Sequence, residues 1–98
     1  MYNTAVFKSD RFEMYEEVKT ILARTLQLGE RANRIRPETP LMGNLPELDS
    51  MAVVSILTAL EDHYGFVIED DEISAETFAT MGSLVSFVER KVKKQVSS

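Results

Sequence analysis

The stretch Ser50–Tyr64 constrains the fold more than any other part of this chain. Apolar residues recur in it at spacings of three and four, the pattern of an amphipathic helix. On a helical wheel of roughly 100° per residue, one side carries Val53, Ile56, Leu57, Leu60 and Tyr64. Asp49 can accept hydrogen bonds as the N-cap, and Gly65 can end the helix in a left-handed conformation. The sequence therefore predicts a helix over 50–64 with this side on a core.

The opposite side of this helix has an unusual composition for a surface. It carries Met51, Val54, Ser55, Thr58, Glu61 and Asp62. Single exposed apolar residues are common, and a solvated face is the simpler interpretation. Two large apolar side chains beside the helix start and two acids near its end favour a surface that docks a partner.

Two further helices are indicated on either side of this one. Asp10 and Glu13 resemble a capping box, and an apolar stripe follows from Met14 to Leu26, which predicts a helix over 10–28. Gly29 would supply its left-handed cap. Thr80 can cap a later helix with an apolar stripe over 81–88. Residues 1–8 and 94–98 are interpreted as loose ends.

The connections between these helices are long. Residues 29–48 include Pro37 and Pro40, which interrupt helix, and the apolar Leu41, Met42 and Leu45 are expected to fold back onto the core. Residues 66–68 predict an extended, buried loop, and Ser74 can cap a brief helix through Phe78. The fold class predicted for residues 1–98 is all-α: a single domain of three main helices plus one short helix, with a long first loop.

Charge is distributed unevenly along the chain. Residues 37–89 contain eleven acidic side chains and no Lys or Arg, within a net charge of −5. Such a block would repel phosphate, so nucleic acid is excluded as the partner and a basic docking patch is favoured. The acidic run 69–72 lacks the alternating ligands and glycine of a calcium loop, so no metal site is expected. With no apolar run of membrane length and no signal-like start, the sequence predicts a cytoplasmic protein without membrane insertion, acting as a monomer.

The chain offers few groups for catalysis. It contains no cysteine and a single histidine, His63, so neither a Cys–His pair nor a histidine metal site can be built. Ser50 and His63 would lie about 20 Å apart on one continuous helix, given a rise of about 1.5 Å per residue. A Ser–His relay is therefore excluded, and His63 is interpreted as a structural or surface residue. The sequence predicts a protein that catalyses no reaction by itself.

Ser50 still has a chemical use at the start of a helix. Unpaired N–H groups and the positive end of the helix dipole favour an anion at this point. A phosphate esterified to the Ser50 hydroxyl would place its charge where the helix tolerates it best. Asp-Ser before a helix is by itself usually no more than a cap.

The wider set of residues around Ser50 resembles the acyl carrier protein family. The resemblance runs over Asp49-Ser50-Met51, Val54, Ala59-Leu60-Glu61-Asp62, Tyr64-Gly65, Ile68 and Asp70-Asp71-Glu72, and the helix count extends it over 10–90. It implies that Ser50, with Asp49 beside it, receives 4′-phosphopantetheine from coenzyme A through a phosphopantetheinyl transferase. The thiol of this arm would carry acyl thioesters between acyl-loading and acyl-transfer enzymes.

The same resemblance assigns the two sides of the central helix. Partner enzymes would contact Met51, Val54, Thr58, Glu61 and Asp62, and an acyl cleft would be lined by Ile56, Leu60 and Tyr64.

This chain also departs from the family pattern at some positions. The segment Leu45-Pro46-Glu47-Leu48 replaces the usual glycine-containing approach to Asp-Ser. The motif Pro-Glu-Leu-Asp-Ser-Met resembles the corresponding motif of carriers associated with exosortase and exopolysaccharide gene clusters. Two alternatives stay open from the residues: a peptidyl or aminoacyl carrier, and a non-covalent helical adaptor that docks through Met51, Val54 and Thr58.

Overall fold

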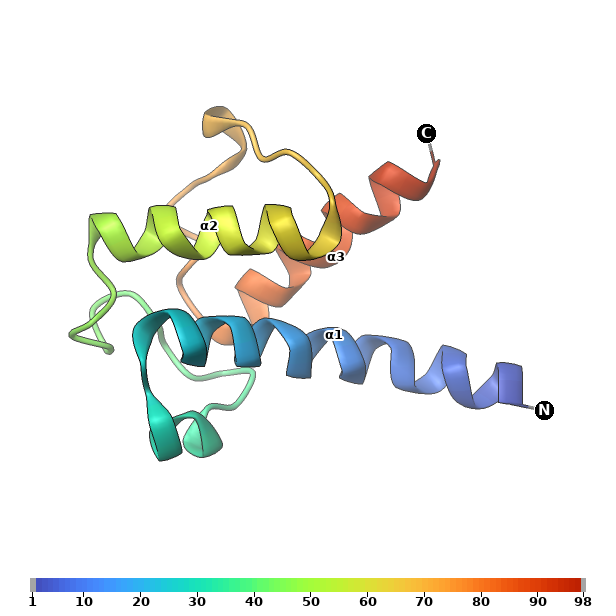
Figure 1. Cartoon of the computed structure of the whole chain (residues 1–98), viewed down its shortest axis with the longest axis horizontal. Helices are drawn as coiled ribbons and strands as arrows, with labels where there is room; N and C mark the ends of the chain where they lie inside the picture. The colour runs from blue at the N-terminus through green and yellow to red at the C-terminus, as the bar shows by residue number, and fades with distance from the viewer. Residues whose placement is uncertain (1, 98) are drawn as a thin grey trace.

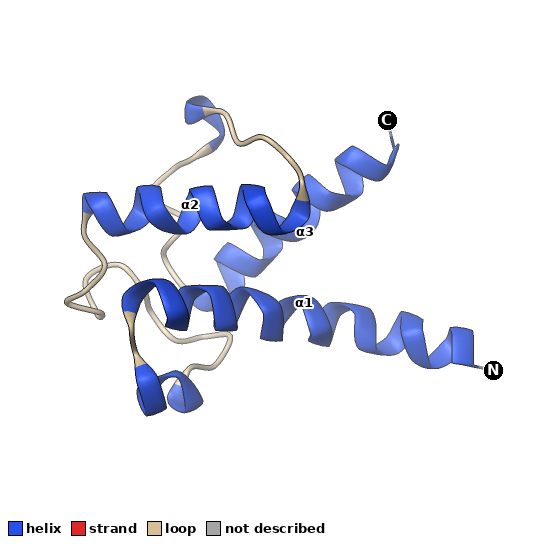
Figure 2. Ribbon diagram, viewed as in Figure 1, coloured by secondary structure: helices blue, strands red, loops and turns tan. Residues whose placement is uncertain are grey.

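Three α-helices surround one hydrophobic core in a computed structural model that describes the backbone of residues 2–97 and the side chains of residues 12–93. They are α1 (Tyr2–Leu26), α2 (Ser50–Tyr64) and α3 (Met81–Ser97). Figure 1 shows α1 and α2 lying side by side and antiparallel, with α3 crossing behind them. Two short 3₁₀ helices, η1 (Gly29–Arg34) and η2 (Asp70–Glu72), lie within the connections, which Figure 2 shows as long loops. The predicted all-α bundle with a long first loop is confirmed.

The central helix has the boundaries that its sequence predicts. Asp49 Oδ1 accepts a 2.9 Å hydrogen bond from Ala52 N, and Gly65 closes the helix at φ +74°. Ile56 and Leu60 have no exposed surface, whereas Val53, Leu57 and Tyr64 are partly buried against the same core. The predicted orientation of α2 is therefore correct.

The first helix differs from its prediction at both ends. It begins at Tyr2, so residues 2–8 belong to α1; no proline or glycine interrupts helix there. Met1 and the Asp10 side chain lie outside the described residues. The helix ends at Leu26, where Leu28 N bonds Ala23 O at 2.9 Å and Gln27 adopts φ +57°. This arrangement is a Schellman cap with Gln27 at its left-handed position; Gly29 is also left-handed, at φ +62°, but lies beyond the cap.

The connection between α1 and α2 folds back onto the core through part of its predicted contacts. Leu41 is fully buried, and its N–H bonds Ala79 O at 3.0 Å beside an isolated bridge between Pro40 and Thr80. Leu45 is partly buried, but Met42 is 50% exposed, so its predicted burial is wrong. The bridge between Pro40 and Thr80 fixes the direction of the chain here. With Leu41 turned inward, the side chain of Met42 points outward.

The connection between α2 and α3 was predicted less well. The brief helix expected from Ser74 to Phe78 is absent from the structure as described, and hydrogen-bonded turns take its place. The helical turn lies earlier, at η2, where Glu69 and Glu72 form a reciprocal capping box. Of the apolar run 66–68, Phe66 is buried but Val67 is 67% exposed. The prediction of a wholly buried loop is therefore wrong for Val67.

The last helix begins as predicted. Thr80 Oγ1 accepts a 3.1 Å hydrogen bond from Ser83 N, and Ser83 Oγ accepts one of 3.0 Å from Thr80 N. Its apolar stripe, including Leu84 and Val88, is buried in the core. The helix continues to Ser97, beyond residue 94, where a loose end was expected; Ser98 lies outside the described residues.

Candidate functional site

Ser50 stands at the first turn of α2, on the outside of the molecule. Its side chain is exposed, and so is that of Asp49. Asp49 uses its carboxylate to cap Ala52 N, so it fixes the helix start and leaves the neighbouring hydroxyl open to solvent. An anion on Ser50 Oγ would meet the positive end of the α2 dipole. The residues present therefore fit a phosphate-linked group at this position.

The outward face of α2 extends from Ser50 toward the far end of the helix. Met51 is 75% exposed and Val54 57% exposed, and Thr58 and Asp62 are also exposed. The predicted apolar pair is thus presented to solvent directly beside Ser50, within reach of any protein that approaches the hydroxyl.

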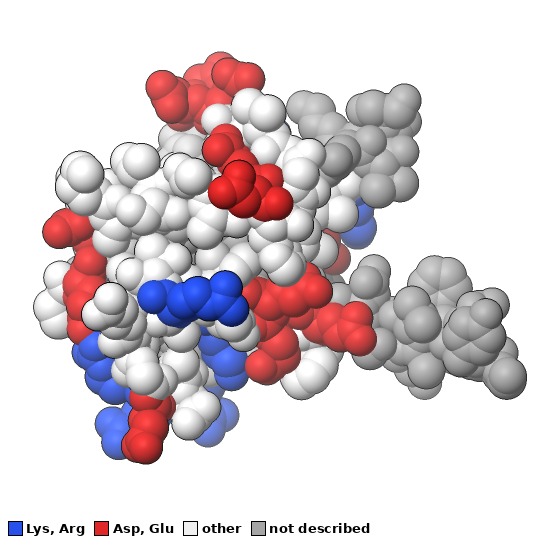
Figure 3. Space-filling model, viewed as in Figure 1, with Lys and Arg blue, Asp and Glu red and all other residues white. Residues whose placement is uncertain are grey.

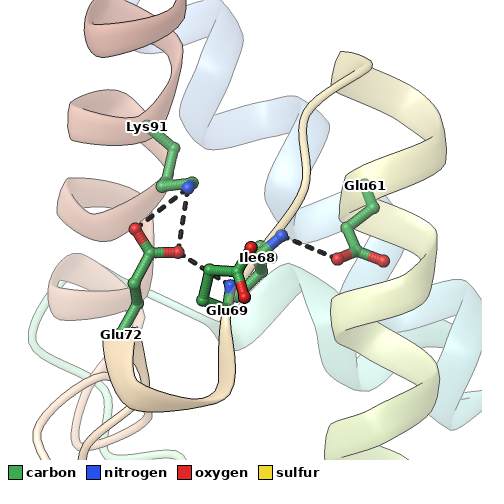
Figure 4. A network of polar contacts seen from close by, with 5 residues as sticks. All are labelled: Glu61, Ile68, Glu69, Glu72 and Lys91. Atoms are coloured by element: carbon green, nitrogen blue, oxygen red, sulfur yellow. Dashed lines mark hydrogen bonds and ion pairs between the residues drawn. The ribbon is translucent and has the colours of Figure 1, made fainter.

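Glu61 lies on this face and also bonds the loop that follows α2. Its side chain is partly buried because Glu61 Oε2 accepts a 2.7 Å hydrogen bond from Ile68 N in the following loop. Figure 4 shows this bond beside a second one, in which Glu69 N donates to Glu72 Oε1 at 2.9 Å. Lys91 of α3 reaches both oxygens of Glu72, at 2.9 and 3.0 Å. These contacts hold the loop between α2 and α3.

The three residues assigned to an acyl cleft lie in the interior. Ile56 and Leu60 are completely buried, and Tyr64 is partly buried with its ring stacked 5.7 Å from that of Phe66. Sheltering a chain here requires side chains of the core to move apart.

An open groove lies elsewhere, among residues to which the sequence assigned no site. It has a volume of about 710 Å³ and lies between α1 and the first half of α3. Its lining residues are Phe12, Tyr15, Pro37, Thr80, Gly82, Ser83, Val85 and Ser86. The small residues Gly82, Ser83 and Ser86 were the available signal, because larger side chains at these positions would fill the space.

His63 lies beside α1 and far along the helix from Ser50. Its Nε2 is 3.7 Å from Glu17 Oε1, and its ring meets that of Tyr64 edge-on at 4.6 Å. Tyr64 donates a 2.7 Å hydrogen bond to the same Glu17 oxygen, and burial together with that carboxylate raises the pKa of the phenol. His63 was predicted to be a structural or surface residue, and its side chain is 46% exposed.

Charge is segregated over the surface. In the view of Figure 3, acidic side chains lie over η2, over the far end of α2 and over the middle of α1, and basic ones lie over α1 and near η1. Among residues 12–93 no group of three or more His, Cys, Asp or Glu side chains is placed to hold a metal ion. No helix within the described residues is both long enough and apolar enough to span a bilayer.

Comparison with known proteins gives concordant matches. The family described as phosphopantetheine attachment site matches residues 16–88. An acyl carrier protein of Helicobacter hepaticus is 32% identical over 77 residues, covering 79% of this chain and 95% of the relative. One from Thermotoga maritima is 27% identical over 84 residues, covering 86% and 98%. The solution NMR structure of a holo acyl carrier protein from Nitrosomonas europaea is 53% identical, with a TM-score of 0.75, covering 81% of this chain and 95% of that one.

Proposed function

Because the chain belongs to the phosphopantetheine-attachment family of acyl carrier proteins, we propose that Ser50 is the residue that carries its prosthetic arm. Members of this family are carriers rather than enzymes, and their cofactor is 4′-phosphopantetheine. The single observation that supports Ser50 is its position: an exposed hydroxyl on the first residue of α2, beside a cap made by Asp49. In the loading reaction Ser50 Oγ would form a bond to phosphorus, the pyrophosphate bond of coenzyme A would break, and 3′,5′-ADP would leave.

Once attached, the phosphate has a favourable electrostatic position. The diester charge lies at the positive end of the α2 dipole, which stabilises an anion there by about 0.3–1 kcal/mol at an exposed site. The terminal thiol of the arm supplies the thioester chemistry, which accords with a chain that contains no cysteine of its own.

The outward face of α2 is the proposed contact for the phosphopantetheinyl transferase and for acyl-loading and acyl-transfer enzymes. Met51 and Val54 would fill apolar depressions of a partner, and Asp62 and Glu61 would attract its basic groups. Met51 and Val54 are 75% and 57% exposed beside the proposed attachment point, which supports this use. Ile56, Leu60 and Tyr64 would shelter the acyl chain after the core opens.

The finer context of the carrier is also part of the proposal. Residues 1–98 would act as one carrier domain, supported by the single core cluster that all three helices share. We also propose a cytoplasmic location, which the sequence predicts and in which coenzyme A, the proposed donor, is available. The sequence motif from Pro46 to Met51 supports a role in exopolysaccharide-associated acyl transfer.

Intact mass spectrometry tests the attachment point. The purified protein is incubated with coenzyme A, magnesium and a broad-specificity phosphopantetheinyl transferase. Wild type and Ser55→Ala, a matched change of another exposed serine on α2, should each gain one phosphopantetheine, and Ser50→Ala should gain none. A wild type that stays unmodified while folded would contradict the proposal and leave a helical adaptor as the alternative.

The partner face is tested by loading kinetics. Met51→Ala and Val54→Ala should raise the KM of the transferase for the carrier. Val67→Ala is the matched control, because the exposure of Val67, 67%, lies between those of Met51 and Val54, but Val67 lies in the loop after α2. Equal effects at all three positions would contradict a docking surface on α2.

A further inference from the structure

The segment leading into Ser50 is built from successive turns, and Gly43 lies in the first of them. Between Gly43 and Ser50 the chain reads Asn-Leu-Pro-Glu-Leu-Asp. Successive turn bonds join Leu45 N to Leu41 O at 3.1 Å and Leu48 N to Leu45 O at 3.0 Å. Leu48 is 7% exposed and anchors the segment to the core. The position of the Ser50 hydroxyl therefore depends on where this segment is held.

One polar contact joins the segment to a distant part of the chain. Glu47 Oε2 accepts a hydrogen bond from Nη2 of Arg31, sixteen residues earlier, in an ion pair. The other oxygen, Oε1, is shielded from solvent and has no hydrogen-bond partner among the described residues. The Arg31 guanidinium holds the pKa of the Glu47 carboxyl below its usual value. Without Arg31, the Glu47 carboxylate would lose its cationic partner, and the side chain would be free to turn toward water.

Arg31 is itself held in place by its neighbours. It lies on η1, and the residues that flank this helix, Leu28 and Ile35, are 4% and 7% exposed. Tyr15 of α1 donates a 2.9 Å hydrogen bond to Ile35 O. The ion pair thus connects the approach to Ser50 with a frame fixed on α1.

We propose that Arg31 is a positioning residue for the loading of Ser50: through Glu47 it fixes the segment that presents the hydroxyl to the transferase. The inference rests on the proposed function. Arg31 touches no reacting atom, and its contribution lies in orientation. An ion pair whose side chains are 48% and 31% exposed contributes little to global stability. Its loss is therefore expected in loading kinetics more than in the melting temperature.

A double-mutant cycle with a charge exchange tests the proposal. The kcat/KM of loading is measured by intact mass for wild type, Arg31→Ala, Glu47→Ala, the double alanine variant and the exchanged pair Arg31→Glu with Glu47→Arg. Each single change should lower kcat/KM roughly three- to tenfold. The double variant should be no worse than either single one, and the exchange should restore most of the loss. Arg34→Ala, which removes another exposed arginine of η1, should stay within about twofold of wild type.

Other results overturn the proposal. Additive losses, or a charge exchange that is worse than Arg31→Ala, would mean that Arg31 contacts the transferase or the coenzyme A phosphates directly. An equal loss in Arg34→Ala would mean that positive charge near η1 matters in general. Unchanged single variants would mean that the turns hold the segment without the ion pair.

Amide hydrogen exchange separates this inference from the attachment site. Leu48 N and Ala52 N are both hydrogen-bonded at the start of α2, so their exchange should be several-fold faster in Arg31→Ala and unchanged in Arg34→Ala. If wild type takes no phosphopantetheine, the proposed function fails, whatever the exchange rates. If wild type loads but neither loading nor exchange responds to Arg31, the positioning role alone fails.

Discussion

Tyr64, the last residue of α2, donates a 2.7 Å hydrogen bond to Glu17 of α1, 47 positions earlier in the chain. The bond joins the end of the helix that carries Ser50 to the helix against which it lies. The Tyr64 ring also stacks on Phe66, so the tie extends into the loop that follows α2. The Ser50 end of α2 is held differently, by the Asp49 cap and the turns that precede it.

Tyr64→Phe should lower the free energy of unfolding by about 1 kcal/mol, the contribution of a typical hydrogen bond. Burial and Glu17 raise the pKa of the Tyr64 phenol above its unfolded value of 10.0. The corresponding stability is fully present below pH 10 and is lost as pH rises further, because only the unfolded chain then releases the proton. Wild type should therefore lose stability above pH 10 more steeply than Tyr64→Phe, measured by thermal melts across alkaline pH. Parallel curves would contradict the bond.

Leu60→Ala should lower the free energy of unfolding by about 2–5 kcal/mol, because it empties part of a fully buried site. Thr58→Ala on the exposed face of the same helix is the matched control and should stay within about 0.5 kcal/mol. Urea denaturation measures both. A loss below about 0.5 kcal/mol for Leu60→Ala would mean that α2 faces the core with another side.

Asp49→Ala should cost about 1 kcal/mol through loss of the N-cap, and Asp49→Asn should retain most of it, because an amide oxygen can accept from Ala52 N. Loading by the transferase distinguishes a structural from a direct role. If Asp49→Asn folds with wild-type stability but loads slowly, the negative charge of the carboxylate contributes directly to the loading reaction. If it loads normally, Asp49 acts only by forming the cap.

Lys91→Met should destabilise the loop between α2 and α3 by about 1–3 kcal/mol, because it removes the ammonium group that bonds both oxygens of the Glu72 carboxylate, which is 26% exposed. The Glu69 amide, which bonds Glu72 Oε1, should exchange faster with solvent. Lys93→Met is the control, since Lys93 is 76% exposed in an i,i+4 pair with Glu89. Similar exchange in both variants would show that Lys91 does not hold this loop.

Moderate salt should raise the melting temperature of the protein. Eleven acids and no Lys or Arg occupy residues 37–89, and Figure 3 shows acidic groups clustered on the face in view. Screening weakens their repulsion more than it weakens the partly buried pair of Lys91 and Glu72. Thermal melts from low to moderate salt check this; a flat or falling trend would argue against a concentrated acidic surface.

The α2 helix shows how far local sequence reasoning reaches. Its boundaries, its caps at Asp49 and Gly65 and its buried face all follow from residue spacing and side-chain type, since these act within a few positions of the chain. The resemblance around Ser50 likewise led to the family that the comparisons establish. The roles of individual residues on the partner face remain predictions.

The conformation of the connecting loops depends on contacts with distant segments, and residue spacing along the chain does not reveal these contacts. Met42 and Val67 are apolar and were expected inside, but contacts with other segments turn them outward. The short helix forms at η2 rather than after Ser74. At η2 the capping box of Glu69 and Glu72 is supported by Lys91 from α3.

The sequence by itself determined where the helix that begins at Ser50 would start and end and which of its sides would be buried, because periodicity and capping are local properties. Only the tertiary structure decided that Glu61 would accept a hydrogen bond from the Ile68 amide and that Tyr64 would donate one to Glu17. It also decided that Arg31 would pair with Glu47 in the segment before Ser50. Each of these contacts joins residues from different elements, and their pairing depends on how the helices pack.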